Sequence, residues 1–170
     1  VNEGLVSGAI FDYDPNTDSY FATNSLEPWH GYWFAALEDS VSLWFDYRNL
    51  EHETGNNKTY PATEGWLVSV TMDQGAESLT YGTSESATTG FDSALDMPIP
   101  PCPPSEIPKP TMRFVHPEWN ISTGEYFSSD IIPTTEGGAQ WSAWLTIPEP
   151  GQITIRWDSS NIPVDSDNQI

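Results

Sequence analysis

Basic residues are scarce in this sequence. Lysine and arginine together number 5, against 25 acidic residues, and the formal net charge is −20 at pH 7. Proteins bind nucleic acids and anionic membrane surfaces through lysine and arginine, so we expect no nucleic-acid partner and no membrane insertion. The charge balance suits a soluble surface protein, a binder of divalent cations or a protein from salty water.

Cysteine is almost missing as well. Cys102 is the only one, which excludes an intramolecular disulfide, and it lies among prolines without a histidine nearby to make it a metal ligand or a nucleophile. No apolar run reaches the length of a transmembrane helix, and no signal peptide is visible. The sequence begins with Val1 rather than Met, which predicts a processed product or an internal fragment, so export is expected from composition alone.

Aromatic residues are abundant instead, with 8 Trp, 7 Tyr and 7 Phe in 170 residues. Most of the tryptophans lie in short alternating runs, and Gly, Pro, Ser, Thr, Asn and Asp interrupt the chain every few residues. This pattern offers no convincing amphipathic helix and is typical of an all-β protein. We therefore predict an antiparallel β-sandwich of Ig-like or jelly-roll type, in a rigid extracellular module.

Local patterns predict several strands. Residues 8–13 and 19–22 form a hairpin around the turn 14–17, and residues 31–37 pair with 41–47 in a second hairpin. A strand over 66–72 has its even-numbered residues inward. Near the end, strands 140–147 and 152–158 flank the turn sequence Glu149-Pro150-Gly151 and are expected to pair. Their inward sets are Trp141, Ala143, Leu145 and Ile147, and Ile153, Ile155 and Trp157.

Seven prolines lie between residues 97 and 110. They argue against pairing in a β-ladder and favour an extended strap laid across the sandwich. We predict a β-sandwich over residues 63–170 that includes this strap. Residues 1–62 are expected to be an N-terminal β-hairpin subdomain or a part of the same sandwich.

Six segments carry a resemblance to a known type of module. They are SLEPWHGYWF (25–34), EGWLVSV (64–70), ATTGFDSALDMPIPPCPP (87–104), FVHPEW (114–119), YFSSDI (126–131) and GQITIRWD (151–158). In this order they resemble β-sandwich modules of large secreted bacterial cell-surface proteins, found near C-terminal sorting domains or flagellar-hook-cap-like Ig domains. The resemblance implies export and an Ig-like or jelly-roll sandwich, and it implies no catalytic residue.

The end of the chain departs from this resemblance. Such modules usually continue with another hairpin after the last strong strand, whereas this sequence stops at Ile170, after a polar stretch. Either the chain is truncated or the sandwich lacks a strand. A missing strand would leave an open edge that another subunit could fill by strand addition.

Oxygen-bearing side chains alternate at Asp12, Asp14, Asn16 and Asp18. This spacing matches the first ligand positions of a calcium loop, so calcium is the one cofactor to consider. The glycine and the glutamate that complete such a loop are replaced by Thr17 and Thr23. Pro15 also suits a simple hairpin turn, which is the favoured interpretation.

Three tryptophans, Trp33, Trp44 and Trp144, fall on the faces opposite the inward sets of their strands. If these faces are exposed, the rings could contact a neighbouring subunit or stack on sugar rings. The alternative is that both faces of each sheet are covered. Asn57 and Asn120 each begin a sequon for N-glycosylation.

No nucleophile elbow or phosphate-binding glycine loop occurs, and the three histidines do not share metal-ligand spacing. The enzyme alternative is a jelly-roll glycosidase, which needs two carboxylates across a cleft. No acidic motif singles out such a pair, and Glu38, Glu118 or Glu125 would be arbitrary choices. We therefore predict no enzyme activity.

The sequence as a whole predicts a secreted, non-catalytic structural or interaction module. It would be a subunit of an extracellular filament or surface layer, or a surface-display domain, with itself or other surface proteins as partners. The alternative is a carbohydrate-binding module that uses exposed tryptophans and binds polysaccharide. In both cases the expected location is extracellular or at the cell surface.

Overall fold

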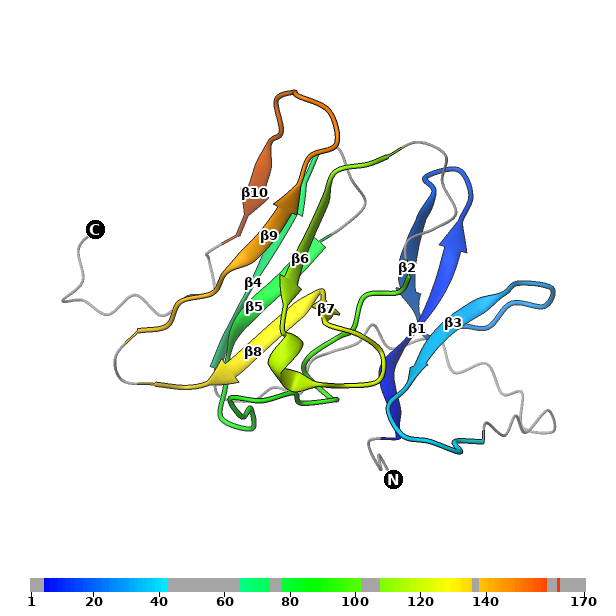
Figure 1. The fold of residues 1–170 in the computed structure, drawn as a ribbon, viewed down its shortest axis with the longest axis horizontal. Helices are drawn as coiled ribbons and strands as arrows, with labels where there is room; N and C mark the ends of the chain where they lie inside the picture. Colours follow the sequence, from blue (N-terminus) through cyan, green and yellow to red (C-terminus); the bar gives the residue numbers. More distant parts are fainter. Residues whose placement is uncertain are drawn as a thin grey trace.

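The computed structural model describes residues 5–42, 65–73, 78–101, 108–135 and 138–158, together with Ile162. Strands dominate these residues, which confirms the predicted all-β class, and the one helix among them is the short 3₁₀ turn η1 (Pro117–Trp119). No helix in the described part of the chain is long and apolar enough to cross a membrane. Figure 1 shows a β-sandwich with a separate small sheet beside it.

The small sheet is N-terminal and has the order β2-β1-β3. Its strands are β1 (Val6–Asp14), β2 (Ser19–Thr23) and β3 (Tyr32–Ala36). The β1–β2 hairpin confirms the first prediction, because Asp14 pairs with Ser19 across the expected turn. The third strand is also where the alternation placed it, but it pairs with β1. Its predicted partner over 41–47 lies, apart from its first two residues, outside the described residues.

One sheet of the sandwich has the order β10-β4-β5-β8. It contains β4 (Gly65–Met72), β5 (Ser78–Ser84), β8 (Ser129–Pro133) and β10 (Ile155–Trp157). The pairs β10–β4 and β4–β5 are antiparallel, whereas β5 and β8 run parallel. The buried residues of β4 are Val68 and Met72, in agreement with the predicted inward face.

The facing sheet has the order β7-β6-β9 and is antiparallel. It consists of β6 (Thr111–Val115), β7 (Tyr126–Phe127) and β9 (Ala143–Thr146). The core between the sheets joins Leu79 of β5 to residues of β6 and β7, and aromatic rings surround it. Its fully buried members are Leu79, Met112, Phe114 and Phe127.

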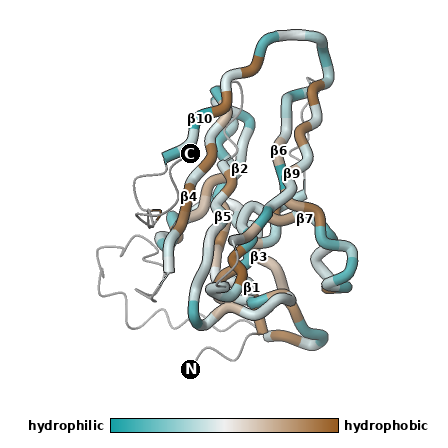
Figure 2. Tube along the Cα trace, turned by 90° about the vertical axis from the view of Figure 1, so that its left-hand side faces the viewer, coloured by the Kyte–Doolittle hydropathy of each residue, from teal (hydrophilic) through white to brown (hydrophobic). Residues whose placement is uncertain are grey.

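The predicted hairpin of residues 140–158 is wrong in its pairing. β9 pairs with β6 and β10 pairs with β4, so the turn at 149–151 carries the chain from one sheet to the other (Figure 2). The alternation itself is correct, since Trp141 packs against the core and Leu145 lies opposite Met112. A turn sequence between two alternating runs identifies two strands, but it does not say that they pair with each other.

The start of the proline-rich segment pairs with β7, contrary to the prediction that its prolines prevent pairing. Pro98 forms an isolated antiparallel bridge with Phe127. The hydrogen bonds come from its neighbours, because Ile99 N–H donates to the Tyr126 carbonyl (2.9 Å) and Ser128 N–H donates to the Met97 carbonyl (2.8 Å). Pro98 occupies a position whose own N–H would not be used, so the missing donor costs nothing.

Candidate binding cleft

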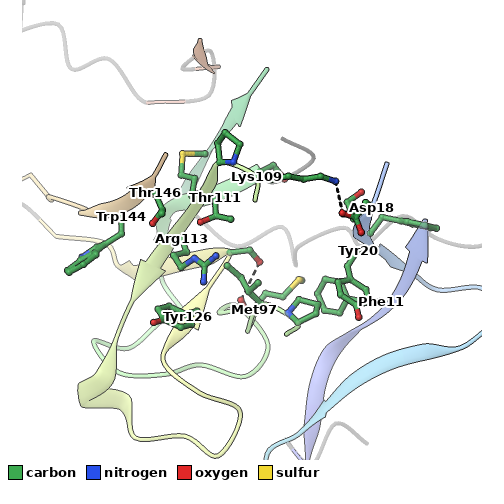
Figure 3. Close-up of a pocket in the computed structure, with 18 of the residues that line it drawn as sticks. Phe11, Asp18, Tyr20, Met97, Lys109, Thr111, Arg113, Tyr126, Trp144 and Thr146 are labelled. Atoms are coloured by element: carbon green, nitrogen blue, oxygen red, sulfur yellow. Dashed lines mark hydrogen bonds and ion pairs between the residues drawn. The ribbon is translucent and has the colours of Figure 1, made fainter. Parts of the chain in front are cut away.

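A cleft of about 800 Å³ lies between the small N-terminal sheet and the outer face of the β7-β6-β9 sheet (Figure 3). The β1–β2 hairpin forms one wall, and β6 and β9 form the other. Residues of the proline-rich segment on both sides of its undescribed middle, such as Met97 and Lys109, complete the lining. This volume is in the range of sites that hold small organic ligands.

Strand alternation determines which side chains face the cleft. Met112 and Phe114 of β6 point into the core, so Arg113 between them points outward. The β6–β9 register sets Arg113 directly opposite Trp144, and the next pair on the same face is Thr111 with Thr146. The site therefore stands on a sheet whose other face is anchored in the core.

Lys109 connects the β1–β2 hairpin to the proline-rich segment that leads into β6. Its Nζ donates to the carbonyl of Thr17 (2.8 Å) and forms an ion pair with Asp18 Oδ2 (3.0 Å). Asp18 also accepts a hydrogen bond from the Tyr13 hydroxyl (2.7 Å), which raises the pKa of Tyr13 above its usual value. Tyr20 and Phe21 of β2 contribute aromatic surface to this wall.

The charge of the lining differs from that of the chain. Lys109 and Arg113, two of the 5 basic residues in a sequence with 25 acidic ones, line the cleft. Asp18 is the one acidic residue among the described residues that line it. Since Asp18 is paired with Lys109, the positive charge that remains in the cleft is that of Arg113.

Arg113 is incompletely satisfied. Its guanidinium carbon lies 4.7 Å from the centroid of the Tyr126 ring, a cation–π contact. Its Nε is buried and has no hydrogen-bond partner, and the described residues offer the side chain no ion pair. Because an arginine is always charged and carries donors in a fixed fork, this is a place where an acceptor is missing.

The tryptophans predicted to face outward differ in their surroundings. Trp144 is 68% exposed and lines the cleft. Trp33 is half-buried and packs edge-on against Phe11, with ring centroids 5.6 Å apart. Trp44 lies outside the described residues. Trp144 is therefore the one of the three for which the structure offers an open contact surface.

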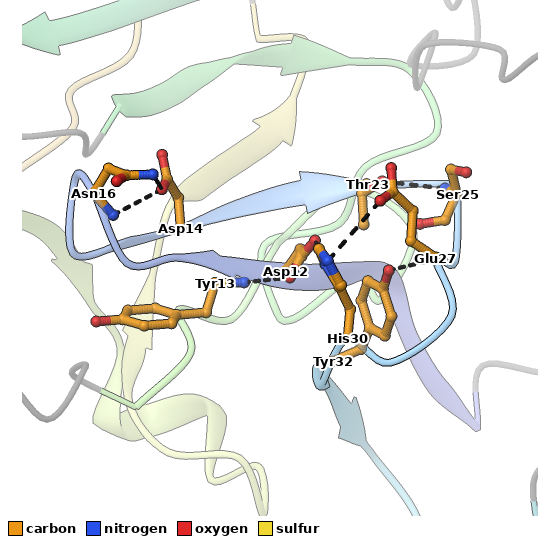
Figure 4. Close-up of polar contacts among 9 residues, drawn as sticks. All are labelled: Asp12, Tyr13, Asp14, Asn16, Thr23, Ser25, Glu27, His30 and Tyr32. Carbon is orange, nitrogen blue, oxygen red and sulfur yellow. Dashed lines mark hydrogen bonds and ion pairs between the residues drawn. The ribbon is translucent and has the colours of Figure 1, made fainter.

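Of the candidate calcium ligands, Asp14 and Asn16 contact each other, whereas Asp12 and Asp18 have other partners (Figure 4). Asp12 contacts His30 Nδ1 (3.1 Å), and Asp14 accepts hydrogen bonds from the backbone and side chain of Asn16 (2.9 and 3.0 Å). These bonds to Asn16, with one from Thr17, lower the pKa of Asp14. Asp18 faces Lys109 instead. No group of three acidic, His or Cys residues in the described chain could hold a metal ion, and the contacts of Asp14 are those of a hairpin turn.

The remaining candidate residues lie away from the cleft. Asn120 is exposed at the end of η1 in the left-handed region (φ 47°), so its side chain is accessible, whereas Asn57 lies outside the described residues. Glu118 pairs with His116 Nδ1 (2.7 Å), which lowers the pKa of Glu118. Glu38 and Glu125 are not among the residues that line the cleft.

His116 and two buried carboxyl groups, Asp96 and Asp130, lie outside the lining of the cleft. His116 Nε2 contacts Asp130 Oδ2 (3.2 Å), and the imidazole stacks on Trp119 at 3.8 Å between ring centroids. Asp96 is 2% exposed and accepts hydrogen bonds from the backbone N–H groups of Asp92 (2.7 Å) and Ile131 (3.0 Å). Burial raises the pKa of Asp96 to about 7. These contacts hold the segment before the prolines against β8.

Sequence reasoning overlooked Arg113, Tyr126 and Lys109 as site residues. A usable signal for Arg113 was its place between two inward-facing apolar residues, in a chain with only 5 basic residues. No local signal shows that the hairpin packs opposite it. Comparisons with protein-family models, curated proteins and solved structures give no match for this chain.

Proposed function

We propose that this chain is an extracellular, non-catalytic binding module whose cleft binds carbohydrate. The observation that carries the proposal is Trp144, an indole 68% exposed in the wall of an 800 Å³ cleft, on a strand that the core holds in place. Rigid aromatic faces stack on the C–H faces of sugar rings with little loss of conformational entropy. The cleft thus supports the carbohydrate alternative over the assembly role that the sequence favoured.

Neighbouring side chains suit the same ligand. Thr111 and Thr146 are paired on the face that carries Trp144 and offer hydroxyl groups as donors and acceptors. Export and a place at the cell surface remain part of the proposal, supported by the composition and by the resemblance to secreted bacterial modules.

The test compares two exposed tryptophans, Trp144 in the cleft and Trp157 on β10, which is 65% exposed. Intrinsic fluorescence is titrated with a panel of neutral and acidic oligosaccharides at constant protein concentration. We expect Trp144→Ala to weaken binding roughly tenfold or more, and Trp157→Ala to leave it unchanged. Absence of binding to every glycan by the unaltered chain would refute the proposal.

One observation favours assembly as a second candidate function. The inner faces of β9 and β10 expose Leu145, Ile155 and Trp157, and Ile147 just after β9 is exposed as well, at 38–65% of each residue. Apolar surface of this kind is typical of contacts between subunits. Sedimentation over a range of concentrations tests this role with the same variants. Self-association that is lost in Trp157→Ala and kept in Trp144→Ala would support it.

A further inference from the structure

We propose that the saccharide bound in this cleft is acidic and that Arg113 binds its carboxylate. The proposal rests on the proposed carbohydrate function and specifies its ligand. A sugar acid, such as a hexuronate within an oligosaccharide, combines the two features that the cleft provides for, a ring to stack and a carboxylate to pair.

Arg113 has no acceptor for its guanidinium donors among the described residues. Nε is buried without an acceptor, the described residues give the terminal nitrogens no acceptor either, and a carboxylate in the cleft can accept from both terminal nitrogens at once. Lys109 cannot take this role, because its ammonium group is already bound to Asp18 and to the carbonyl of Thr17. Arg113 is therefore the cation in the cleft that is available to a ligand.

A row of three side chains crosses the outer face of the β7-β6-β9 sheet. Tyr126 on β7 and Trp144 on β9 flank Arg113 on β6, the middle strand. Adjacent strands are about 4.8 Å apart. Two spacings between strands, together with a shift of two residues along the strands, separate the two aromatic side chains by roughly 10–12 Å. Figure 3 shows the Arg113 guanidinium above the Tyr126 ring, with Trp144 further out on the same sheet. A short oligosaccharide can span this distance with a carboxylate at the centre.

The net charge of the protein bears on the size of the ligand. With a net charge of −20, the protein repels anions at long range, whereas within a Debye length of about 8 Å the nearby charge of Arg113 contributes most to the potential in the cleft. Recognition is therefore of individual acidic residues held in the cleft, rather than adsorption of a long anionic chain on a basic surface.

The test uses the full chain and a panel of oligosaccharides that contain galacturonate, glucuronate, mannuronate or guluronate, each beside its carboxyl-reduced, neutral form. Calorimetry measures binding by the unaltered protein and by Arg113→Gln. Arg156→Gln is the matched control, since Arg156 pairs with Asp73 in the other sheet (2.7 Å). Circular dichroism and thermal melting establish that each variant folds.

We expect at least one acidic glycan to bind roughly tenfold or more tightly than its reduced form, a preference that Arg113→Gln removes and Arg156→Gln retains. Arg113→Lys should restore only part of it, because an ammonium lacks the planar fork. Should acidic and reduced forms bind equally, the acidic-ligand inference fails while the carbohydrate function stands. Binding of an oligo-glutamate peptide but of no glycan would overturn both, and so would binding of neither.

Discussion

The two ends of the sandwich share the same alternation of inward and outward side chains, but the inward side chains are buried at one end and exposed at the other. Near β7, the inward-facing Phe114 and Phe127 are 2% and 0% exposed. Where β9 and β10 reach the turn between the sheets, the inward-facing Leu145, Ile155 and Trp157 are 38–65% exposed. Figure 2 shows the chain crossing from one sheet to the other over this second end. Alternation thus determines which face of a strand is apolar, whereas burial depends on a partner that covers this face.

The largest effect on stability is expected at the end of the sandwich near β7, which we call the closed end. Phe127→Ala removes a ring that contacts Phe91, Trp119 and His116, and it should lower the free energy of unfolding by about 3–5 kcal/mol. Urea denaturation measures the change. Phe127→Leu, which keeps most of the buried volume, should cost clearly less. Equal losses for the two variants would show that cavity formation is not the cause.

The closed end also desolvates a carboxyl group. Because burial raises the pKa of Asp96 to about 7, the folded chain holds a proton that the unfolded chain releases near pH 4. The associated stability is fully present below pH 4 and is lost as the pH rises through 7. The loss is at most about 4 kcal/mol by linkage.

Denaturation of the unaltered chain and of Asp96→Asn between pH 4 and 8 tests this. We expect the unaltered chain to lose stability relative to Asp96→Asn as the pH rises from 4 to 7. Asp73 offers a contrast of opposite sign, since Arg156 lowers its pKa and the stability that it contributes is lost as the pH falls. Parallel curves for the two proteins would mean that Asp96 is ionised throughout.

The next effect comes from close approach of backbones in β4 and β5. An added Cβ at Gly82 would collide with the carbonyl oxygen of Trp66 and the Cα of Leu67. Gly82→Ala should therefore cost about 2–3 kcal/mol of unfolding free energy. Gly31→Ala is the control, because nothing lies within 4 Å of its Cβ position, and it should change stability by less than about 1 kcal/mol.

The smallest effect on stability is expected at the end where β9 and β10 reach the turn between the sheets, which we call the open end. Trp157→Ala removes a ring that is 65% exposed, so it should lower the free energy of unfolding of the monomer by less than about 1 kcal/mol. Urea denaturation at low protein concentration measures this. A loss comparable to that of Phe127→Ala would show that the inner face of β10 is covered in solution, and the contrast between the two ends would disappear.

Local chemistry explains which parts of the fold were predictable. The β1–β2 hairpin follows from the turn at residues 14–17, where Asp14 binds the backbone N–H of Asn16. The turn at 149–151 gives an equally strong signal but joins strands of different sheets. Which strands pair is decided by burial of residues far apart in the sequence, and periodicity carries no information about this.

In the candidate site as well, local features could be predicted from the sequence, whereas contacts between distant residues could not. Alternation predicted that Trp144 faces away from the core, and it does. The importance of Arg113 depends on the hairpin and the proline-rich segment packing opposite β6, and on Lys109 neutralising Asp18. These contacts join residues some 90 positions apart. A single sequence without its fold does not reveal them.

The parallel pairing of β5 with β8 has a consequence for the route by which the chain folds. Antiparallel neighbours such as β4 and β5 can form by closing a short turn, but Thr80 meets Ser129 only after the intervening chain has been arranged. β6 and β7 lie in that interval and belong to the opposite sheet. We therefore expect β8 to dock late and to couple the two sheets, and we expect refolding to be slow for a chain of this length.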